Sequence, residues 1–356
     1  MNRRWICSDV WMDILPSFER VELGLKMALI SDRFDILVDT HFGGKSELTI
    51  WRTIKICVGI ELKAKLSVEN DDTFEEFPLP DNPLPNKIRF KDLWIDYIDY
   101  SVITFLHANK QIWDRMGTKL TLEVWSYENE GVQPIWDVLA SEIWPIFATN
   151  IRHLSFTNGD HLDNLRRRTS PTILTDVNHL NSINSDRLCP DGIADDGPNA
   201  SAGQALTKWL HTPSKNGQPK RLFFENYDAE VNLDWVNSFK EAFLRATASP
   251  VSYKIDFEVP KTAIEPFELM NERTKEKLTL LALRENVDED SDDEYIKWLL
   301  KRCPISEKAA AIQWENDENW DDNLNIVQVI LWSGGINLIG PLSPPPAEEE
   351  KEKADE

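Results

Sequence analysis

Hydrophobic and polar positions alternate with a period of two along residues 46–68. The apolar positions are the even-numbered Leu48, Ile50, Ile54, Ile56, Val58, Ile60, Leu62, Leu66 and Val68. Such alternation is typical of a β-strand, or of a hairpin, with one buried face. Residues 69–86 are acidic and then proline-rich, and proline continues neither a helix nor a central sheet ladder. We therefore expect a strand or hairpin, followed by a linker that contains a domain boundary.

A four-residue pattern recurs along residues 87–340: a basic residue, an aliphatic residue, any residue, and then usually an aromatic residue or leucine. The copies are KIRF (87–90), KLTL (119–122), HLSF (153–156), RLFF (221–224), KIDF (254–257) and KLTL (277–280). Their aliphatic anchors are Ile88, Leu120, Leu154, Leu222, Ile255 and Leu278. Three gaps between anchors are 32, 34 and 33 residues, and a fourth is 68, or twice 34, whereas the last gap of 23 breaks the period. Degenerate copies are RLCP (187–190), at the midpoint of the long gap, and AIQW (311–314).

Helix-like segments separate these copies. They are Asp99–Arg115, Gln204–His211, Leu233–Ala246 and Glu294–Arg302. Strands that alternate with helices at a fixed period predict parallel strands joined by right-handed crossovers, and a repeat of 20–50 residues is typical of a solenoid. We therefore predict an α/β fold in which an N-terminal helical hairpin precedes a solenoid that resembles leucine-rich repeats. The alternative is an ordinary α/β sheet with regular spacing.

The face of the sheet opposite the anchors carries a predicted basic stripe. Side chains alternate along a strand, so residues next to the anchors point away from the helices. The candidate substrate-binding residues on this face are Lys87, Arg89, Lys119, His153, Arg221, Lys254 and Lys277, with Arg187 in the degenerate copy. Like charges on strands about 4.8 Å apart repel each other unless they are neutralised. Either an acidic segment of a partner neutralises them, or carboxylates on the same face do so: Glu123, Glu225, Asp256 and Glu258.

Residues 5–42 are apolar at helical spacing on more than one side. A first helix would carry Val10, Trp11, Ile14, Leu15 and Phe18, and a second would carry Leu23, Met27, Ile30 and Phe34 on one stripe and Leu25 and Leu29 on another. Pro16 should end the first helix near Leu15. A helical hairpin with two apolar faces buries one face internally and needs a partner for the other.

This segment, ICSDVWMDILPSFERVELGLKMALISDRFDIL, resembles the F-box motif. Val10, Ile14, Leu15 and Phe18 match its first helix, and Leu23 matches the leucine that opens the second. Ile30-Ser31-Asp32-Arg33-Phe34, followed by Leu37, matches the VSRRF…L signature of the family. Ile6-Cys7 replaces the usual Leu-Pro, and Asp32 replaces a usual basic residue. Together with LPLPDNPLPNKIRF and IWPIFATNIRHLSF, the layout of the whole chain looks like the large F-box families of nematodes.

The resemblance implies a substrate receptor of a cullin–RING (SCF-type) ubiquitin ligase. F-box helices bind the Skp adaptor, and the downstream domain holds an unknown protein substrate without doing chemistry itself. The implied adaptor-binding residues are Val10, Ile14, Leu15, Phe18, Leu23, Leu25, Leu29, Ile30, Phe34 and Leu37. The implied organisation is an F-box over 1–45, a hairpin and linker over 46–86, a repeat domain over 87–340 and a disordered acidic tail over 341–356.

Two other functions stay open from the sequence. In the first, the chain is a non-catalytic solenoid scaffold whose N-terminal helices serve as a cap, as solenoids require. In the second, it is an enzyme with a carboxylate site that assembles only in space. Phosphate-binding loops and the common hydrolase and zinc motifs are missing, so we predict no catalytic residue, no metal site and no cofactor. We expect a structural role for His107 and His211, and core packing for Trp94, Trp113, Trp144, Trp209 and Trp235.

Composition narrows the partners and the compartment. Lys plus Arg number 39 and Asp plus Glu number 61, a net charge of −22, which repels phosphate backbones and disfavours nucleic acid. The sequence contains no run of 18 apolar residues, so it predicts no membrane helix. At the N-terminus, charged residues and a proline interrupt the apolar core that a signal peptide would need. The four cysteines are widely spaced. We therefore expect a reduced intracellular protein, cytoplasmic or nuclear, that binds no membrane.

Overall fold

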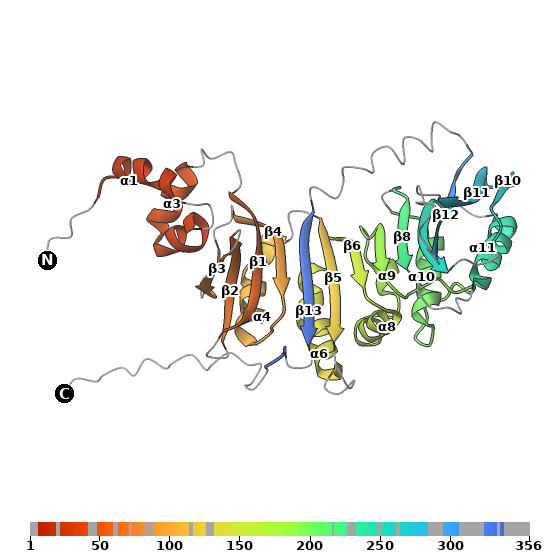
Figure 1. Cartoon of the computed structure of the whole chain (residues 1–356), viewed down its shortest axis with the longest axis horizontal. Helices are drawn as coiled ribbons and strands as arrows, with labels where there is room; N and C mark the ends of the chain where they lie inside the picture. Colours follow the sequence, from red (N-terminus) through yellow and green to blue (C-terminus); the bar gives the residue numbers. More distant parts are fainter. Residues whose placement is uncertain are drawn as a thin grey trace, which may run out of the picture.

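A single mixed sheet organises the chain in the computed structural model (Figure 1). The structure describes residues 6–18, 22–41, 48–59, 63–70, 73–80, 83–84, 88–113, 117–125, 132–215, 217–225, 233–247, 251–260, 264–283, 295–305, 324–332 and 335–337. Within these ranges the sheet has 13 strands in the order β10-β11-β12-β9-β8-β7-β6-β5-β13-β4-β1-β2-β3. The sheet is open, because its first and last strands in this order do not pair with each other.

The strands are β1 (Leu48–Val58), β2 (Ala64–Asn70), β3 (Thr73–Pro78), β4 (Ile88–Ile95), β5 (Thr118–Trp125), β6 (Ile151–Phe156), β7 (Ser182–Ser185), β8 (Lys220–Glu225), β9 (Tyr253–Pro260), β10 (Phe267–Asn271), β11 (Glu276–Leu283), β12 (Tyr295–Pro304) and β13 (Asn325–Trp332). The helical elements near the N-terminus are α1 (Ser8–Ile14), η1 (Leu15–Ser17), η2 (Leu23–Met27), η3 (Ala28–Ile30) and α3 (Asp32–His41). Those between strands are α4 (Tyr100–Ala108), α5 (Lys110–Trp113), α6 (Val132–Val138), η4 (Leu139–Ile143), α7 (Trp144–Phe147), α8 (Gly159–Arg168), α9 (Ile173–Asp176), α10 (Ala202–His211) and α11 (Asp234–Arg245).

The centre of the sheet is parallel and its margins are antiparallel. Strands β1, β4, β13 and β5 to β9 all run in one direction. The hairpin strands β2 and β3 extend one margin, and β12, β11 and β10 extend the other. Consecutive strands from β5 to β9 are neighbours, which confirms the predicted α/β class with helical crossovers. The C-terminal strand β13 departs from this order, because it lies between β4 and β5.

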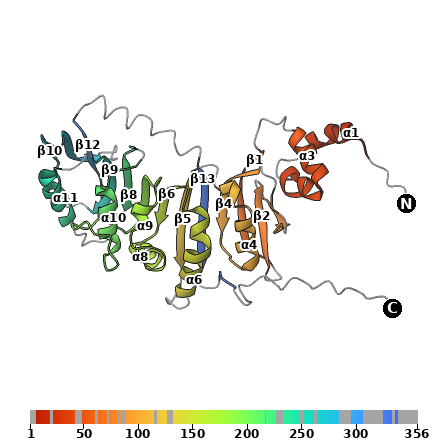
Figure 2. The same cartoon turned by 180° about the vertical axis from the view of Figure 1, so that it is seen from behind.

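The crossover helices cover one face of the sheet, and the described residues place no helix on the other (Figures 1 and 2). A row of fully buried aliphatic side chains crosses the helix-covered face in register. Its members are Ile54, Leu93, Val327, Leu120, Leu154, Ile183, Leu222, Ile255, Leu300 and Leu280. Burial of each side chain contributes about 1.5–3 kcal/mol, so this row supplies a large part of the stability of the core.

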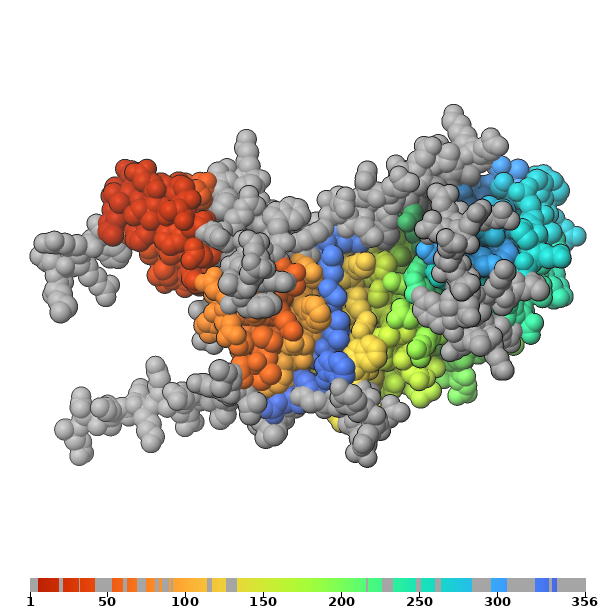
Figure 3. All heavy atoms as spheres, viewed as in Figure 1, coloured from red at the N-terminus to blue at the C-terminus, as the bar shows by residue number. Residues whose placement is uncertain are grey.

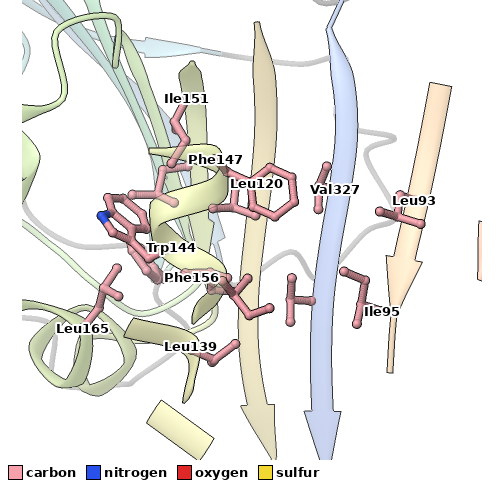
Figure 4. Packing of buried hydrophobic residues seen from close by; sticks show 14 of the residues in the cluster. Leu93, Ile95, Leu120, Leu139, Trp144, Phe147, Ile151, Phe156, Leu165 and Val327 are labelled. Atoms are coloured by element: carbon pink, nitrogen blue, oxygen red, sulfur yellow. The ribbon is translucent and has the colours of Figure 1, made fainter. Parts of the chain in front are cut away.

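Side chains of the helices pack on this row and complete the core. Figure 4 shows Leu139 of η4 with Trp144 and Phe147 of α7 beside the strand residues Leu120 and Phe156. Toward α11, Trp235 packs edge-on against Phe257 with ring centroids 5.3 Å apart, and Phe224 stacks on Phe257 at 5.4 Å. The predicted packing role is confirmed for four of the five tryptophans, which are buried: Trp113, Trp144, Trp209 and Trp235.

Several predicted elements are confirmed. Strands β5, β6, β8, β9 and β11 contain the predicted four-residue copies, and α4 with α5, α10 and α11 occupy the predicted helical segments. The alternating segment 46–68 forms the hairpin β1–β2, with Ile54, Ile56, Leu66 and Val68 buried as its pattern predicts. The copy at 311–314 and the acidic tail lie outside the described residues.

Other predictions are wrong in register or type. The strand between β6 and β8 is Ser182–Ser185, so its buried anchor is Ile183 and not Leu188. In β4 the buried row passes through Leu93 and not Ile88. The predicted helix Glu294–Arg302 is wrong: its described residues lie in β12, because pairing with β9 and β11 satisfies their backbone. The proposed linker contains β3, which extends the same sheet.

A small helical unit formed by residues 6–41 precedes the sheet. Its first helix ends at Ile14 and tightens into the 3-10 turn η1 at Pro16, as the proline predicts. Trp11 of α1 packs edge-on against Phe34 of α3, with ring centroids 4.8 Å apart. The Arg33 side chain donates a 2.6 Å hydrogen bond to the carbonyl of Ile6. These contacts hold the first and last helices of the unit together.

Candidate binding surfaces

The N-terminal helical unit exposes five aliphatic side chains, and we call this set the aliphatic patch. Its members are Ile6, Val10, Ile14, Ile30 and Ile36, which lie on α1, η3, α3 and the residues before α1. Ile30 is 59% exposed and Ile36 is 64% exposed, although both are large apolar side chains. Scattered apolar residues are normal on surfaces, but five on one unit of this size form a candidate interaction site.

The predicted adaptor-binding residues divide into three groups. Val10, Ile14 and Ile30 are exposed, and Phe18, Leu29 and Phe34 are partly buried. Leu15, Leu23, Leu25 and Leu37 are buried within the chain, so these four cannot contact a partner directly. The prediction is corrected for them: they form the internal face of the unit. Ile6 and Ile36 are exposed but were not among the predicted residues, because helical spacing alone does not tell which stripe is internal.

One cation joins the helical unit to the sheet. The Lys26 ammonium on η2 lies 2.5 Å from the Glu75 carboxylate of β3 and 4.8 Å above the centre of the Phe77 ring. Hydrogen bonding to Glu75 raises the pKa of Lys26. Because both groups are partly exposed, this ion pair contributes about 1 kcal/mol at most.

The open face of the sheet, which carries no helix, displays a basic row. Six residues are in register on neighbouring strands from β5 to β12: Lys119, His153, Ser182, Arg221, Lys254 and Lys301. Four of the predicted stripe residues therefore do lie side by side: Lys119, His153, Arg221 and Lys254. Lys301 is an addition, because residues 295–304 form a strand.

Other predicted stripe residues lie off this row. In β4 the backbone of Arg89 pairs with Thr49, and the row passes through Asp92 instead. On β7 the row position is Ser182, and Arg187 follows the strand as an exposed residue. Lys277 on β11 lies two residues from Thr279, the partner of Lys301. Lys87 lies outside the described residues.

Neighbouring carboxylates neutralise part of the basic row. The Lys254 ammonium lies 3.0 Å from the Asp256 carboxylate, and the Lys277 ammonium lies 3.6 Å from that of Glu268. Burial and the nearby Lys119 lower the pKa of His153 to about 3, so this imidazole is neutral at physiological pH. The charges of Lys254 and Lys277 are therefore neutralised within the chain, and His153 carries no charge at physiological pH.

A second, acidic row crosses the open face nearer the carboxyl ends of the parallel strands, which point downward in Figure 1. It contains Glu123 on β5, Asp186 directly after β7, Glu225 on β8 and Glu258 on β9, and the last two are register partners. Burial raises the pKa of Glu123, with a contribution from Asp186, and burial and Glu225 raise the pKa of Asp186. Asp186 therefore repels Glu123 and Glu225, whereas Glu258 is also the register partner of Lys297 on β12.

Two exposed tryptophans lie beside the acidic row. Trp125 and Trp332 are register partners at the ends of β5 and β13, with ring centroids 6.1 Å apart and an angle of 26° between the rings. The Nε1–H of Trp125 donates to the Glu123 carboxylate at 3.2 Å. Trp94, predicted to pack in the core, is half-buried on this same open face, with the Lys55 ammonium 5.1 Å from its ring centre.

Among the described residues, no group of histidine, cysteine and acidic side chains could hold a metal ion. The four cysteines form no disulfide. Across the same residues, no helix has the length and apolar character needed to cross a membrane. A comparison of the chain with known protein families, curated proteins and solved structures found no match.

Proposed function

We propose that this chain is a substrate-receptor subunit of a cullin–RING ubiquitin ligase. The N-terminal helical unit would act as an F-box that docks on the Skp adaptor, and the repeating β-α units would act as a solenoid-like platform for an unknown protein substrate. The observation that carries the proposal is the aliphatic patch, defined above, on a helical unit whose sequence resembles the F-box. The chain itself would do no chemistry and would act in the cytoplasm or nucleus.

The patch has a physical reason to be covered. Burying one aliphatic side chain of this size contributes about 1.5–3 kcal/mol, so an adaptor that covers several of the five gains a large part of a stable interface. The buried residues of the unit give it an internal core, so the patch is rigid before the adaptor arrives. A preformed surface binds with a smaller loss of conformational entropy.

The arrangement of the two surfaces suits a receptor. The helical unit lies at the β3 end of the sheet, and the open face extends away from it toward β9 (Figure 1). A substrate held on that face would be linked to the ligase without blocking the adaptor. Tethering of this kind accelerates transfer of ubiquitin by raising the effective concentration of the substrate.

Adaptor capture tests the proposal. We expect Val10→Asp and Ile14→Asp each to weaken binding of purified Skp adaptor about 30-fold or more, because a charge would be buried without a partner at the interface. Ile193→Asp is the matched control, since Ile193 is 63% exposed but lies outside the helical unit. Isothermal titration calorimetry measures the affinities, and circular dichroism confirms that each variant is folded. Wild-type binding by both Val10 and Ile14 variants contradicts the proposal.

A scaffold without ligase association is the second candidate. It is favoured by the ion pair between Lys26 and Glu75, which connects the helical unit to one margin of the sheet, where a cap would lie. In this case a chain without residues 1–47 should lose thermal stability, and adaptor should bind neither form. The ligase receptor instead requires adaptor capture by the full chain.

A further inference from the structure

The tryptophan pair is an unusual feature of the open face. Trp125 is 39% exposed and Trp332 is 48% exposed, although tryptophan carries the largest apolar surface of any side chain. Figure 3 views this face, where β13 lies as a blue stripe between β4 and β5. The hydrogen bond from Trp125 to Glu123 fixes the indole, so the pair offers a preformed aromatic surface.

The acidic row supplies the complementary charge. The row places Asp186 between Glu123 and Glu225, and each of these two carboxylates repels it. The raised pKa values of Glu123 and Asp186 reflect burial and this repulsion. A positive charge placed along the row would relieve it. An indole face also attracts cations, most strongly the planar guanidinium of arginine.

We propose that the carboxyl end of the open face binds an arginine- or lysine-containing segment of a partner protein. One cationic side chain lies against the Trp125–Trp332 pair, and others follow the acidic row toward Glu258. The charge of the row decides this choice of occupant, because an acidic or apolar segment would leave the carboxylates repelling one another. The inference rests on the proposed function only in identifying that partner with the substrate.

Binding of a model peptide tests the inference. The probe is a fluorescein-labelled peptide of five Arg-Ala repeats, and its anisotropy is measured against the full chain. The Trp125→Ala/Trp332→Ala variant keeps the net charge, and we expect binding about five- to tenfold weaker. Glu123→Gln should weaken binding about threefold, because one carboxylate of the row is removed. The matched controls lie on the helix-covered face: Tyr100→Ala for the aromatic change and Glu241→Gln for the charge change.

The controls separate a site from general attraction to an acidic protein. Equal affinity of the tryptophan variant and the wild type overturns the inference, and so does an equal loss in Tyr100→Ala and Glu241→Gln. Spermine that competes at the same tryptophans as tightly as the peptide also overturns it, because the site would then select a small free cation. Adaptor capture is measured on the same variants. If the wild type binds the peptide but does not capture the adaptor, the proposed ligase function is wrong and this inference is still supported.

Discussion

Adjacent residues in this protein take opposite roles when they lie at the boundary of a packed unit. Ile14 is 36% exposed and Leu15 is fully buried, although both match the same helix of the family motif. Adjacent residues of a helix point about 100° apart, so one side chain can face the internal core of the unit while the next faces water. Sequence spacing gave both residues the same apolar role, but the packing of the short helical segments exposes only Ile14.

Two histidines whose pKa values are strongly lowered should make stability depend on pH. Burial lowers the pKa of His153 to about 3 and that of His211 to about 4, whereas an unfolded histidine titrates near 6.5. Below pH 6.5 the unfolded chain binds protons that the native chain does not, so the free energy of unfolding falls as the pH falls. Each histidine contributes a loss of about 2 kcal/mol between pH 7 and pH 5.

Urea denaturation at these two pH values checks this prediction. His153→Gln should reduce the pH dependence by about 2 kcal/mol, because glutamine does not titrate. His179→Gln is the matched control, since His179 is exposed. An unchanged pH dependence in the His153 variant contradicts the assignment of a buried, neutral imidazole.

At the level of elements, sequence reasoning succeeded where a strand carries its own local signal. The copies in β5, β6, β8 and β9 combine an anchor with alternation, and each forms the predicted strand. In contrast, β7 is only Ser-Ile-Asn-Ser and has one apolar residue. The four-residue pattern instead matched RLCP, five residues further along the chain, which is not part of the strand. Residues 295–304 fit both helical and alternating periods, and antiparallel pairing with β9 and β11 decides between them.

A buried ion pair connects the antiparallel strands at this margin of the sheet. Arg302 of β12 and Glu276 of β11 are both buried, with Arg302 Nη2 2.7 Å and Nε 3.3 Å from the carboxylate oxygens. The backbone N–H of Val251, just before β9, also donates to Glu276 at 2.7 Å. The Arg302 guanidinium lies 5.3 Å from the centre of the Phe243 ring of α11. One ion pair thus links three strands and a helix.

Removing the arginine should therefore destabilise the whole margin. We expect Arg302→Met to lower the free energy of unfolding by about 3–5 kcal/mol, because Glu276 keeps a buried charge without its partner. Adding Glu276→Gln should restore part of the loss, because a neutral amide is less costly to bury. Urea denaturation of both variants measures this. A loss below about 1 kcal/mol in Arg302→Met indicates that the pair is solvated and that the margin is held by other contacts.

At the scale of the whole molecule, a long-range pairing limited what the sequence could predict. A repeat of about 34 residues predicts neighbours in chain order, yet the last described strand inserts between β4 and β5. The same insertion brings Trp332 beside Trp125, more than 200 positions apart in sequence. The basic row follows from local repeats and was mostly predicted. The tryptophan pair depends on this insertion, so no local pattern could have revealed it.

Because β13 lies inside the sheet, we expect a chain truncated before this strand to lose its cooperative fold. A chain that ends at residue 323 lacks β13, so β4 and β5 lose their ladder hydrogen bonds and the core loses the fully buried Val327, Val329 and Leu331. Three such side chains contribute about 5–9 kcal/mol, comparable to the whole stability of a typical domain. We expect this chain to show no cooperative thermal unfolding by circular dichroism. A chain that ends at Asn337 keeps β13 and should unfold like the full chain. A synthetic peptide of residues 324–337 should restore cooperative unfolding to the shorter chain, and cooperative unfolding without that peptide contradicts the central position of β13.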